Sequence, residues 1–312
     1  MKRLIIDCDT GIDDSLALLY AGLRKDVRIE AVCSVFGNCS AHQAALNSMK
    51  ILDLISYPEV MIAEGENKPL AGEAHYAANV HGANGIGGVQ LPDSRRKLCG
   101  LASADLLVKL ARDNPGELTL VTLGRMTNVA LALEREPNLP ELIDRLVFMG
   151  GTIYHEGNVG PFVEANIGGD PLAAHRVLKA GFDIVQVGLD VTQTTELTTD
   201  DLNWLAENCR MENQAAVRYL RQALIGYFAF NHEASGMVDC CPVHDPLAML
   251  LALEPQMGRV EYWPAEVETQ GRYTSGQILI DKRLQHEDWP VMGCVMEVDH
   301  RQCVEAILKI FC

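Results

Sequence analysis

A short apolar run near the start of the chain ends in a cluster of carboxylates, and this feature most constrains the fold. The run Leu4–Ile6 has the composition of a buried parallel strand. It is followed by four carboxylates within eight residues, namely Asp7, Asp9, Asp13 and Asp14. An apolar pattern with helical spacing begins at Leu16. The segment therefore predicts a strand that turns sharply into a helix.

The carboxylates of this segment are placed for metal binding. On an extended chain Asp7 and Asp9 point to one side, and Gly11 permits a sharp turn between strand and helix. Ligands of open α/β sheets bind beyond the carboxyl ends of the strands. Crowded negative charges there are unfavourable without a cation, and a hard divalent ion prefers oxygen ligands. The alternative is that Asp13 or Asp14 caps the helix while the other carboxylates are solvated.

Strand-like and helix-like segments alternate along the first 190 residues. Strands are expected at 27–36, 60–63, 118–123, 145–149 and 183–187, and helices at 12–25, 41–55, 103–113, 126–134 and 171–180. The remainder predicts helices at 200–207, 213–231, 245–253 and 301–311, a strand at 291–298 and a β-ribbon at 260–268 and 277–281. This order favours an open, mostly parallel, doubly wound (Rossmann-like) α/β sheet with additional C-terminal helices and a β-ribbon, in one domain of residues 1–312.

Two long segments, 64–98 and 152–169, are polar, rich in glycine and expected to be loops. Loops of this length in a compact domain are usually functional. A further candidate functional segment is Val243-His244-Asp245-Pro246, which places a histidine beside an aspartate. Pro246 at the first helical position would make Asp245 an N-cap, although its carboxylate could also face the strand ends.

Charge and cysteine usage restrict the partners. The net charge of −16 disfavours nucleic acid, because an acidic surface repels phosphates. No apolar stretch is long enough for a membrane span, and no signal peptide is apparent. The ten scattered cysteines contain no CxxC pair, so we expect reduced thiols, a cytoplasmic location and no structural zinc. A small-molecule substrate is the partner class that remains.

The opening segment Asp7–Asp14 resembles the amino-terminal signature of the calcium-dependent nucleoside hydrolases, the inosine–uridine-preferring group. The resemblance continues in order along nearly the whole chain, at Gly37-Asn38, Val80-His81-Gly82, Thr127-Asn128, Met149-Gly150-Gly151, Glu164-Ala165-Asn166-Ile167, Asp170-Pro171 and Val243-His244-Asp245-Pro246. It implies hydrolysis of the N-glycosidic bond of ribonucleosides to ribose and free base. It also implies Ca²⁺ as cofactor and a homodimer or homotetramer.

The same resemblance assigns roles to individual residues. It implies that Ca²⁺ is bound by Asp9, Asp14, Asp245 and the backbone carbonyl of Leu123, with Asp7 supporting the cluster. It implies that the ribose is held by Asp13, Asn38, Asn158, Glu164 and Asn166 above Met149, and that His81 lines the base pocket.

Hydrolysis of an N-glycosidic bond itself requires acidic and proton-donating residues of this kind. Departure of the base leaves an oxocarbenium-like cation that an acidic pocket stabilises. A carboxylate beside a metal-activated water can take its proton, and Asp9 is the candidate general base. The leaving base needs a proton, and His244 is the candidate general acid.

Ordinary structural roles remain open for several of these residues. Asn38 beside Gly37 is compatible with turn chemistry, and His81 with an unremarkable loop position. Glu164 and Asn166 could bond their own backbone. Tyr227 fits core packing better than base stacking.

Three departures from the family pattern leave the preferred nucleoside open. Ala83-Asn84 follow His81-Gly82 where an acidic residue and a small hydroxyl are usual, Ala165 replaces an aromatic residue, and Arg125 replaces a smaller one.

Two other functions are compatible with parts of the sequence. A haloacid dehalogenase-type phosphatase would use Asp7 as nucleophile and Asp9 as acid/base, but no convincing partner lysine is found. A non-catalytic calcium-dependent nucleoside-binding protein would keep the pocket without turnover.

Overall fold

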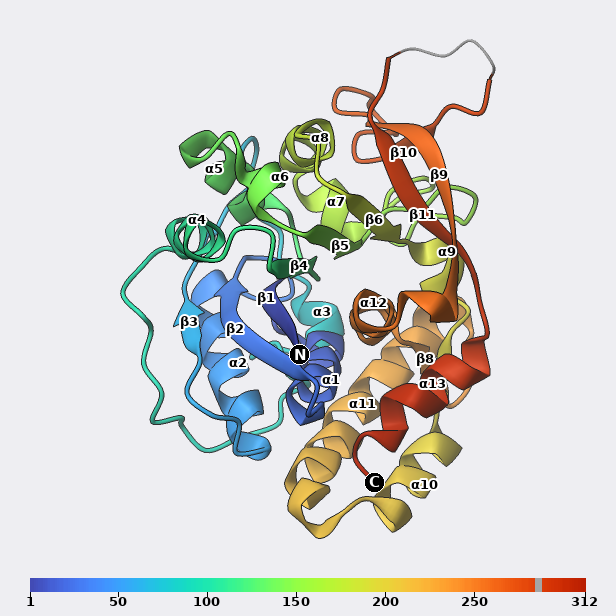
Figure 1. The fold of residues 1–312 in the computed structure, drawn as a ribbon. Coiled ribbons are helices and arrows are strands. Elements are labelled where there is room, and N and C mark those ends of the chain that lie inside the picture. The colour runs from blue at the N-terminus through green and yellow to red at the C-terminus, as the bar shows by residue number, and fades with distance from the viewer. Residues whose placement is uncertain (284–287) are drawn as a thin grey trace.

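A nine-stranded sheet runs through the computed structural model, which describes residues 1–283 and 288–312 (Figure 1). In spatial order its strands are β10 (Ile278–Ile280), β9 (Gly258–Val267), β11 (Val291–Val298), β6 (Ile184–Val187), β5 (Arg145–Met149), β4 (Leu118–Thr122), β1 (Lys2–Cys8), β2 (Val27–Ser34) and β3 (Met61–Ala63). The strands from β11 to β3 pair in parallel, whereas β9 is antiparallel to both β10 and β11. The mostly parallel α/β sheet with a terminal β-ribbon is confirmed.

The sheet is covered on both faces, so its central strands are apolar on both sides. On β1, Leu4 and Ile6 join one core while Ile5 joins the other, as alternation along a strand requires. The first core contains residues of α1 (Ile12–Leu23), α2 (Ala41–Leu54), α10 (Thr199–Asn208), α11 (Gln214–Ser235), α12 (His244–Leu253) and α13 (His300–Lys309). The second contains residues of α4 (Ser103–Asp113), α5 (Thr127–Arg135), α6 (Leu139–Leu142) and α8 (Pro171–Lys179).

Short elements were missed by the sequence patterns. The segments expected to be loops contain the single-turn helices α3 (Ala78–His81) and α7 (Ala165–Gly169). Further short elements are α9 (Leu189–Thr192), the 3₁₀ turns Met211–Asn213 and Pro255–Met257, and a two-stranded antiparallel sheet of β7 (Glu196–Thr198) and β8 (Cys240–Pro242). Strands of three residues are too short to show periodicity, and their pairing is made by tertiary contacts.

The expectation that Asp245 caps its helix is wrong. Helix α12 begins at His244, its N-cap is Val243, and this cap makes no side-chain hydrogen bond. The Val243 N–H instead donates to the carbonyl of Thr195, which fixes the entry of the chain into the helix. The Asp245 carboxylate is therefore free to face the ends of the strands.

The arrangement brings distant segments to one edge of the sheet. The carboxyl ends of β1, β4 and β5 are adjacent in the parallel sheet, and the amino end of α12 lies beside α1 (Figure 1). This edge is where ligands bind in open α/β sheets.

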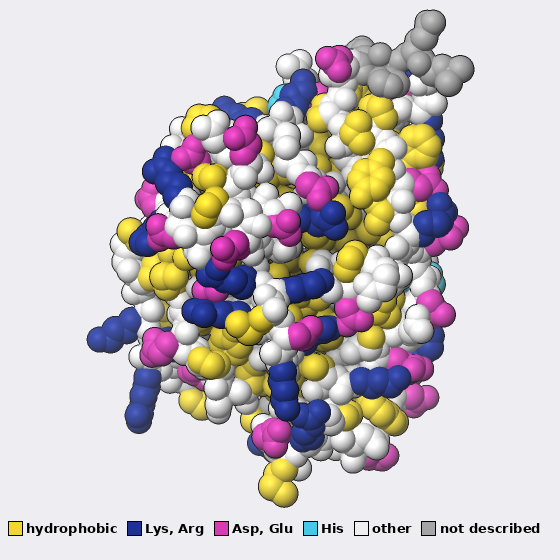
Figure 2. All heavy atoms as spheres, viewed as in Figure 1, with side chains coloured by type: hydrophobic (Ala, Val, Ile, Leu, Met, Phe, Trp, Pro, Cys, Tyr) yellow, Lys and Arg dark blue, Asp and Glu magenta, His cyan; other side chains and the backbone are white. Residues whose placement is uncertain are grey.

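Charged side chains of both signs are interspersed over the face in Figure 2, and apolar side chains gather over the β9–β11 end of the molecule. The exposed apolar residues of this end include Tyr262 and Val291. None of the helices in the described ranges combines the length and apolarity that a membrane crossing needs.

Candidate active site

A pocket of about 520 Å³ opens at the carboxyl ends of β1, β4 and β5. Its lining contains every residue that the sequence analysis proposed for catalysis, metal or substrate except Asp14, namely Asp9, Asp13, Asn38, His81, Leu123, Met149, Asn158, Glu164, Asn166, His244 and Asp245. Asp14 is the next residue after Asp13 in the chain and is fully buried. Residues from segments far apart in the sequence, between Asp9 and Asp245, therefore meet at this one site.

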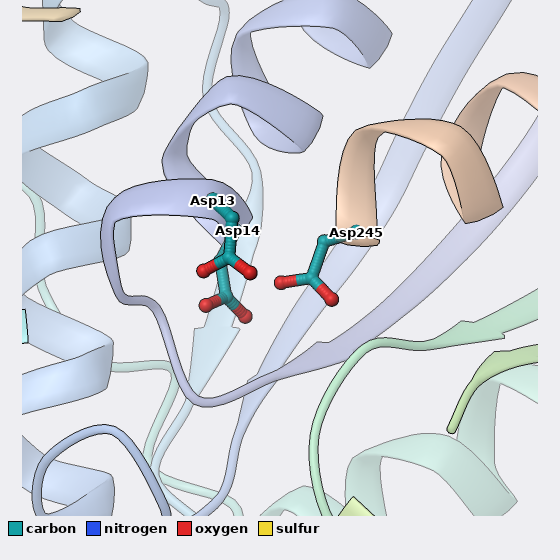
Figure 3. Close-up of side chains that lie close together, drawn as sticks. All are labelled: Asp13, Asp14 and Asp245. Carbon is teal, nitrogen blue, oxygen red and sulfur yellow. The ribbon is translucent and has the colours of Figure 1, made fainter. Parts of the chain in front are cut away.

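Three carboxylates form its centre. The ligand atoms of Asp13, Asp14 and Asp245 all lie within 4.8 Å of one another. Figure 3 shows Asp13 and Asp14 at the start of α1 and Asp245 at the start of α12, with the carboxylates of Asp14 and Asp245 directed toward each other. The sequence analysis placed Asp13 with the sugar rather than the metal, whereas its carboxylate belongs to the tight set and Asp9 lies outside it.

The negative charges of these carboxylates repel one another, and two of their oxygens lack a hydrogen-bond donor. Burial raises the pKa values of Asp13, Asp14 and Asp245. Repulsion from Asp9 and Asp13 raises the pKa of Asp14 further, and repulsion from Asp13, Asp14 and Asp9 raises that of Asp245. The buried Oδ1 atoms of Asp13 and Asp14 accept no hydrogen bond. Buried carboxylates without partners are very unfavourable unless they are neutralised. Oxygen atoms in this state fit a hard divalent cation, and no cysteine or histidine of the described residues belongs to the set.

Asp14 shows that the capping and metal hypotheses are compatible. Its Oδ2 accepts hydrogen bonds from the Gly11 N–H and from Asn38 Nδ2, both at 2.8 Å. One oxygen thus fixes the first turn of α1, which is the capping role. The other oxygen, Oδ1, remains for the cluster.

Two donors bind the same carboxylate oxygen of Asp9. Its Oδ2 accepts from the Asn38 N–H at 2.7 Å and from Arg125 Nη1 at 2.5 Å. Burial raises the pKa of Asp9, and the Arg125 guanidinium acts in the opposite direction. The contacts of Asn38 are with Asp9 and Asp14, so this residue organises the carboxylates in addition to lining the pocket.

The carbonyl of Leu123 lies beside the carboxylates because β4 is the neighbour of β1. The Leu123 N–H donates to the carbonyl of Asp7 at 2.7 Å, which fixes the backbone after β4. Asn166 Nδ2 donates to the Leu123 carbonyl at 2.7 Å and to the Met149 carbonyl at 3.1 Å. Asn166 therefore ties together the ends of β4 and β5.

Glu164 and Asn158 have structural roles as well as pocket positions. Glu164 is the N-cap of α7, where its oxygens accept from the N–H groups of Asn166 at 2.8 Å and Ile167 at 3.1 Å. It also accepts from the Gly151 N–H at 2.8 Å. Asn158 Oδ1 accepts from the Ala165 N–H at 3.0 Å. These bonds form the short helix that presents Asn166 to the site, so backbone bonding and pocket lining are combined.

Two buried histidines face the same cavity. The Ile12 N–H donates to His81 Nδ1 at 3.2 Å, which places the proton of a neutral ring on Nε2. His244 Nδ1 lies 2.8 Å from Thr192 Oγ1. Burial lowers the pKa of each histidine to about 4, and the nearby carboxylates Asp9 and Asp13 oppose this shift. This environment therefore favours the neutral form of both rings.

Several pocket residues were not anticipated. Tyr227, expected in the core, is buried but also lines the pocket, and its ring centroid lies 5.7 Å from that of His81. Gln193 and Asn231 line the pocket as well. Gln193 directly follows the short helix α9, and no local signal marks either Gln193 or Asn231.

Comparison with known proteins identifies the family. The profile described as inosine-uridine preferring nucleoside hydrolase matches residues 4–305. The chain belongs to this family. Uridine nucleosidase 1 of Arabidopsis thaliana is 35% identical over 285 residues, covering 91% of this chain and 83% of the relative. The pyrimidine-specific ribonucleoside hydrolase RihA of Klebsiella pneumoniae is 32% identical over 307 residues, covering 98% and 97%.

Solved structures agree with this assignment to the nucleoside hydrolases. The plant nucleoside hydrolase PpNRh1 superposes with a TM-score of 0.93 at 29% identity, covering 99% of this chain and 98% of that structure. A purine-preferring ribonucleoside hydrolase from Gardnerella vaginalis gives a TM-score of 0.92 at 30% identity, with coverage of 99% and 98%. The protein is an enzyme that hydrolyses the N-glycosidic bond of ribonucleosides, and the phosphatase and non-catalytic alternatives are not favoured.

Proposed function

We propose that this nucleoside hydrolase depends on Ca²⁺, uses Asp9 as general base and uses His244 as general acid. The observation that carries the proposal is the buried set of Asp13, Asp14 and Asp245 beside Asp9, with oxygens that lack partners. Metal dependence is a property of the family, and the oxygen-only donor set favours calcium over zinc.

The residues that would hold Ca²⁺ are those that the family resemblance implies, Asp9, Asp14, Asp245 and the Leu123 carbonyl. Asp14 and Asp245 belong to the tight carboxylate set, and Asp9 and Leu123 line the same pocket. When bound, Ca²⁺ would supply a water of lowered pKa and an anchor for the ribose hydroxyls. Asp7, buried behind the site and bonded to Asn128 at 2.9 Å, supports the strand end that carries Asp9.

The protein residues around the sugar then act on the glycosidic bond. Asp9 takes a proton from the attacking water as the water oxygen bonds to the anomeric carbon and the carbon–nitrogen bond breaks. The carboxylates stabilise the positive charge that develops on the ribosyl group. The ribose hydroxyls are bound by Asp13 and Asn166, and the rest of the sugar by Asn38, Asn158 and Glu164 above Met149.

The departing base leaves as a neutral molecule if it receives a proton. His244 lines the pocket beside Asp245, and Thr192 fixes the orientation of its ring. Burial lowers the pKa of His244 to about 4 and the Asp13 carboxylate opposes this shift, so His244 would act as its imidazolium form, which gives its proton to the base as the carbon–nitrogen bond breaks and returns to neutral imidazole. His81, with its proton on Nε2, and Tyr227 would line the base pocket.

Uridine is the substrate to test first, because relatives with similar sequences are named for uridine or pyrimidine nucleosides. Inosine is the necessary second substrate, because a structural neighbour is named purine-preferring. Chromatography of free uracil or hypoxanthine gives the test. We expect release that EDTA abolishes and Ca²⁺ restores, and that is lost in Asp14→Asn. Full release in EDTA would contradict the calcium requirement.

Three coarser properties complete the proposal. Residues 1–312 would form one domain, supported by a sheet that takes strands from both ends of the chain. The exposed apolar residues at the β9–β11 end would lie in a homodimer or homotetramer, which light scattering tests. A reducing, cytoplasmic location is supported by ten cysteines that are all unpaired.

A further inference from the structure

Arg125, which the sequence analysis noted only as a departure from the family pattern, contacts the candidate general base Asp9. Its side chain is 7% exposed and lies within the pocket lining. Nη1 donates to Asp9 Oδ2 at 2.5 Å and to Asn166 Oδ1 at 3.4 Å. A buried arginine is thus paired with Asp9, one of the carboxylates that would bind a divalent cation.

The surroundings of Arg125 are shaped for this side chain. A Cβ atom on Gly37 would lie 1.9 Å from Nη1, and one on Gly169 would lie 2.5 Å from Nε. The guanidinium carbon is 5.8 Å from the centroid of the Phe36 ring. Two glycines on different segments therefore leave the space that the guanidinium fills, and the ion pair is a built feature of the site.

The ion pair divides the two oxygens of Asp9 between different partners. Oδ2 is taken by Arg125 and by the Asn38 N–H at 2.7 Å. Oδ1 lies on the side of Gly124, 2.9 Å from the position of a Cβ there, directly after Leu123. Asp9 can therefore offer Oδ1 to a metal beside the Leu123 carbonyl, while offering Oδ2 as well would break the pair with Arg125.

We propose that Arg125 is a positioning residue that makes Asp9 a one-oxygen metal ligand and lowers the affinity of the site for Ca²⁺. The proposal rests on the calcium site proposed above. A fixed positive charge next to a divalent cation repels it, and the repulsion is strong in a buried site. The same charge holds the Asp9 carboxylate in place when the metal is absent.

The direct test measures metal binding rather than turnover. In Arg125→Met we expect Ca²⁺ to bind on the order of 10–100-fold more tightly in calorimetry, because one repelling charge is removed. With Tb³⁺ as probe, luminescence lifetimes in H₂O and D₂O count the coordinated waters. We expect one water fewer than in the wild type, because Asp9 then binds through both oxygens. Arg125→Lys, which keeps the charge, should return the affinity close to the wild-type value.

A matched control separates local from general charge effects. Arg135 lies on the neighbouring helix α5 and pairs with Asp105 at the surface, so Arg135→Met removes the same charge elsewhere and should leave Ca²⁺ affinity unchanged. If Arg125→Met does not fold, Arg125→Gln keeps a donor without the charge and should also bind more tightly. Equal or weaker Ca²⁺ binding and an unchanged water count would overturn the role of Arg125.

The two proposals fail in different ways. If the wild type binds Ca²⁺ and Asp14→Asn does not, while Arg125→Met behaves as the wild type, the calcium site holds and the Arg125 proposal fails. If the wild type itself shows no Ca²⁺ binding, the calcium site fails and the Arg125 role fails with it.

Discussion

At the scale of single residues, neighbouring aspartates of one short segment have different partners and therefore different chemistry. Asp7 is fully buried, with Oδ2 bonded to Asn128 and Oδ1 without a partner, whereas Asp9 lines the pocket and its Oδ2 accepts from Arg125 and from the Asn38 N–H. Asp14 divides its oxygens between helix capping and the carboxylate cluster. The spacing of these aspartates in the sequence does not distinguish their roles, whereas their hydrogen-bond partners do.

Asp7 makes the metal-free protein sensitive to pH. Burial raises its pKa from 3.8 to about 8, so the folded state binds a proton that the unfolded state releases above pH 4. The free energy of unfolding should therefore fall as the pH rises from 4 to 8. Asp7→Asn should flatten this slope, which urea titrations in EDTA at several pH values would measure. An unchanged slope would assign the pH dependence to the other carboxylates.

His244 can be tested as a general acid through the leaving group. In His244→Ala, hydrolysis of inosine or uridine should fall on the order of 10²–10⁴-fold, because the base then departs without a proton. p-Nitrophenyl riboside leaves without protonation and should be hydrolysed almost normally. Equal losses on both substrates, with Ca²⁺ affinity intact, would show that His244 serves binding instead.

At the scale of elements, the two long segments around the pocket are held by buried or bridging carboxylates. Asp170 caps α8 and also accepts from the Leu70 N–H at 2.9 Å and from Thr127 at 2.7 Å. Asp190 of α9 accepts from the N–H groups of Ile153 at 2.8 Å, Tyr154 at 2.6 Å and His155 at 3.1 Å. Each carboxylate thereby links one of the two long segments to a helix, Asp170 to α8 and Asp190 to α9.

Removal of the Asp190 carboxylate should weaken substrate binding more than it slows the chemical step. The segment that it holds includes residues 155–159, which line the pocket. Asp190→Ala leaves three backbone N–H groups without their acceptor, so KM should rise several-fold, with a loss of stability of about 1–3 kcal/mol. Asp190→Asn keeps one carbonyl acceptor and should give a smaller change. Steady-state kinetics with uridine would measure both variants, and a fall in kcat at constant KM would contradict the expectation.

At the scale of the whole molecule, the site joins the first and the C-terminal parts of the chain. Asp13 and Asp14 come from α1, and Asp245 comes from α12 (Figure 3). Their repulsion destabilises the metal-free fold, and a bound cation would reverse the sign of this interaction. Metal binding and folding should therefore be coupled through the contact of these two helices.

Calcium should stabilise the entire fold by an amount that grows with the logarithm of its concentration. At 100 times the Kd the free energy of unfolding should increase by about 2.7 kcal/mol. Differential scanning calorimetry with increasing Ca²⁺ should show a rising Tm in the wild type and no change in Asp245→Asn. A rise of the same size in Asp245→Asn would place the stabilising ion elsewhere.

The sequence alone determined the class of fold and most members of the site. Apolar strands that end in polar residues and alternate with helices require a parallel sheet, and the carboxyl ends of parallel strands lie at one edge. That rule explains why Asp9, Leu123, Met149 and the residues of the 152–169 segment meet in one pocket. The assignment of Asp245 came from the resemblance to the nucleoside hydrolases, and the alternative that it caps its helix was wrong.

Only the tertiary structure decided how these residues are paired. The contacts of Asp9 with Arg125, of Asn38 with two aspartates and of His244 with Thr192 join segments far apart in the chain. The packing of α12 against α1 decided that Asp13 belongs to the carboxylate set. Such pairings depend on distances between side chains across the assembled core, and local periodicity carries no information about them.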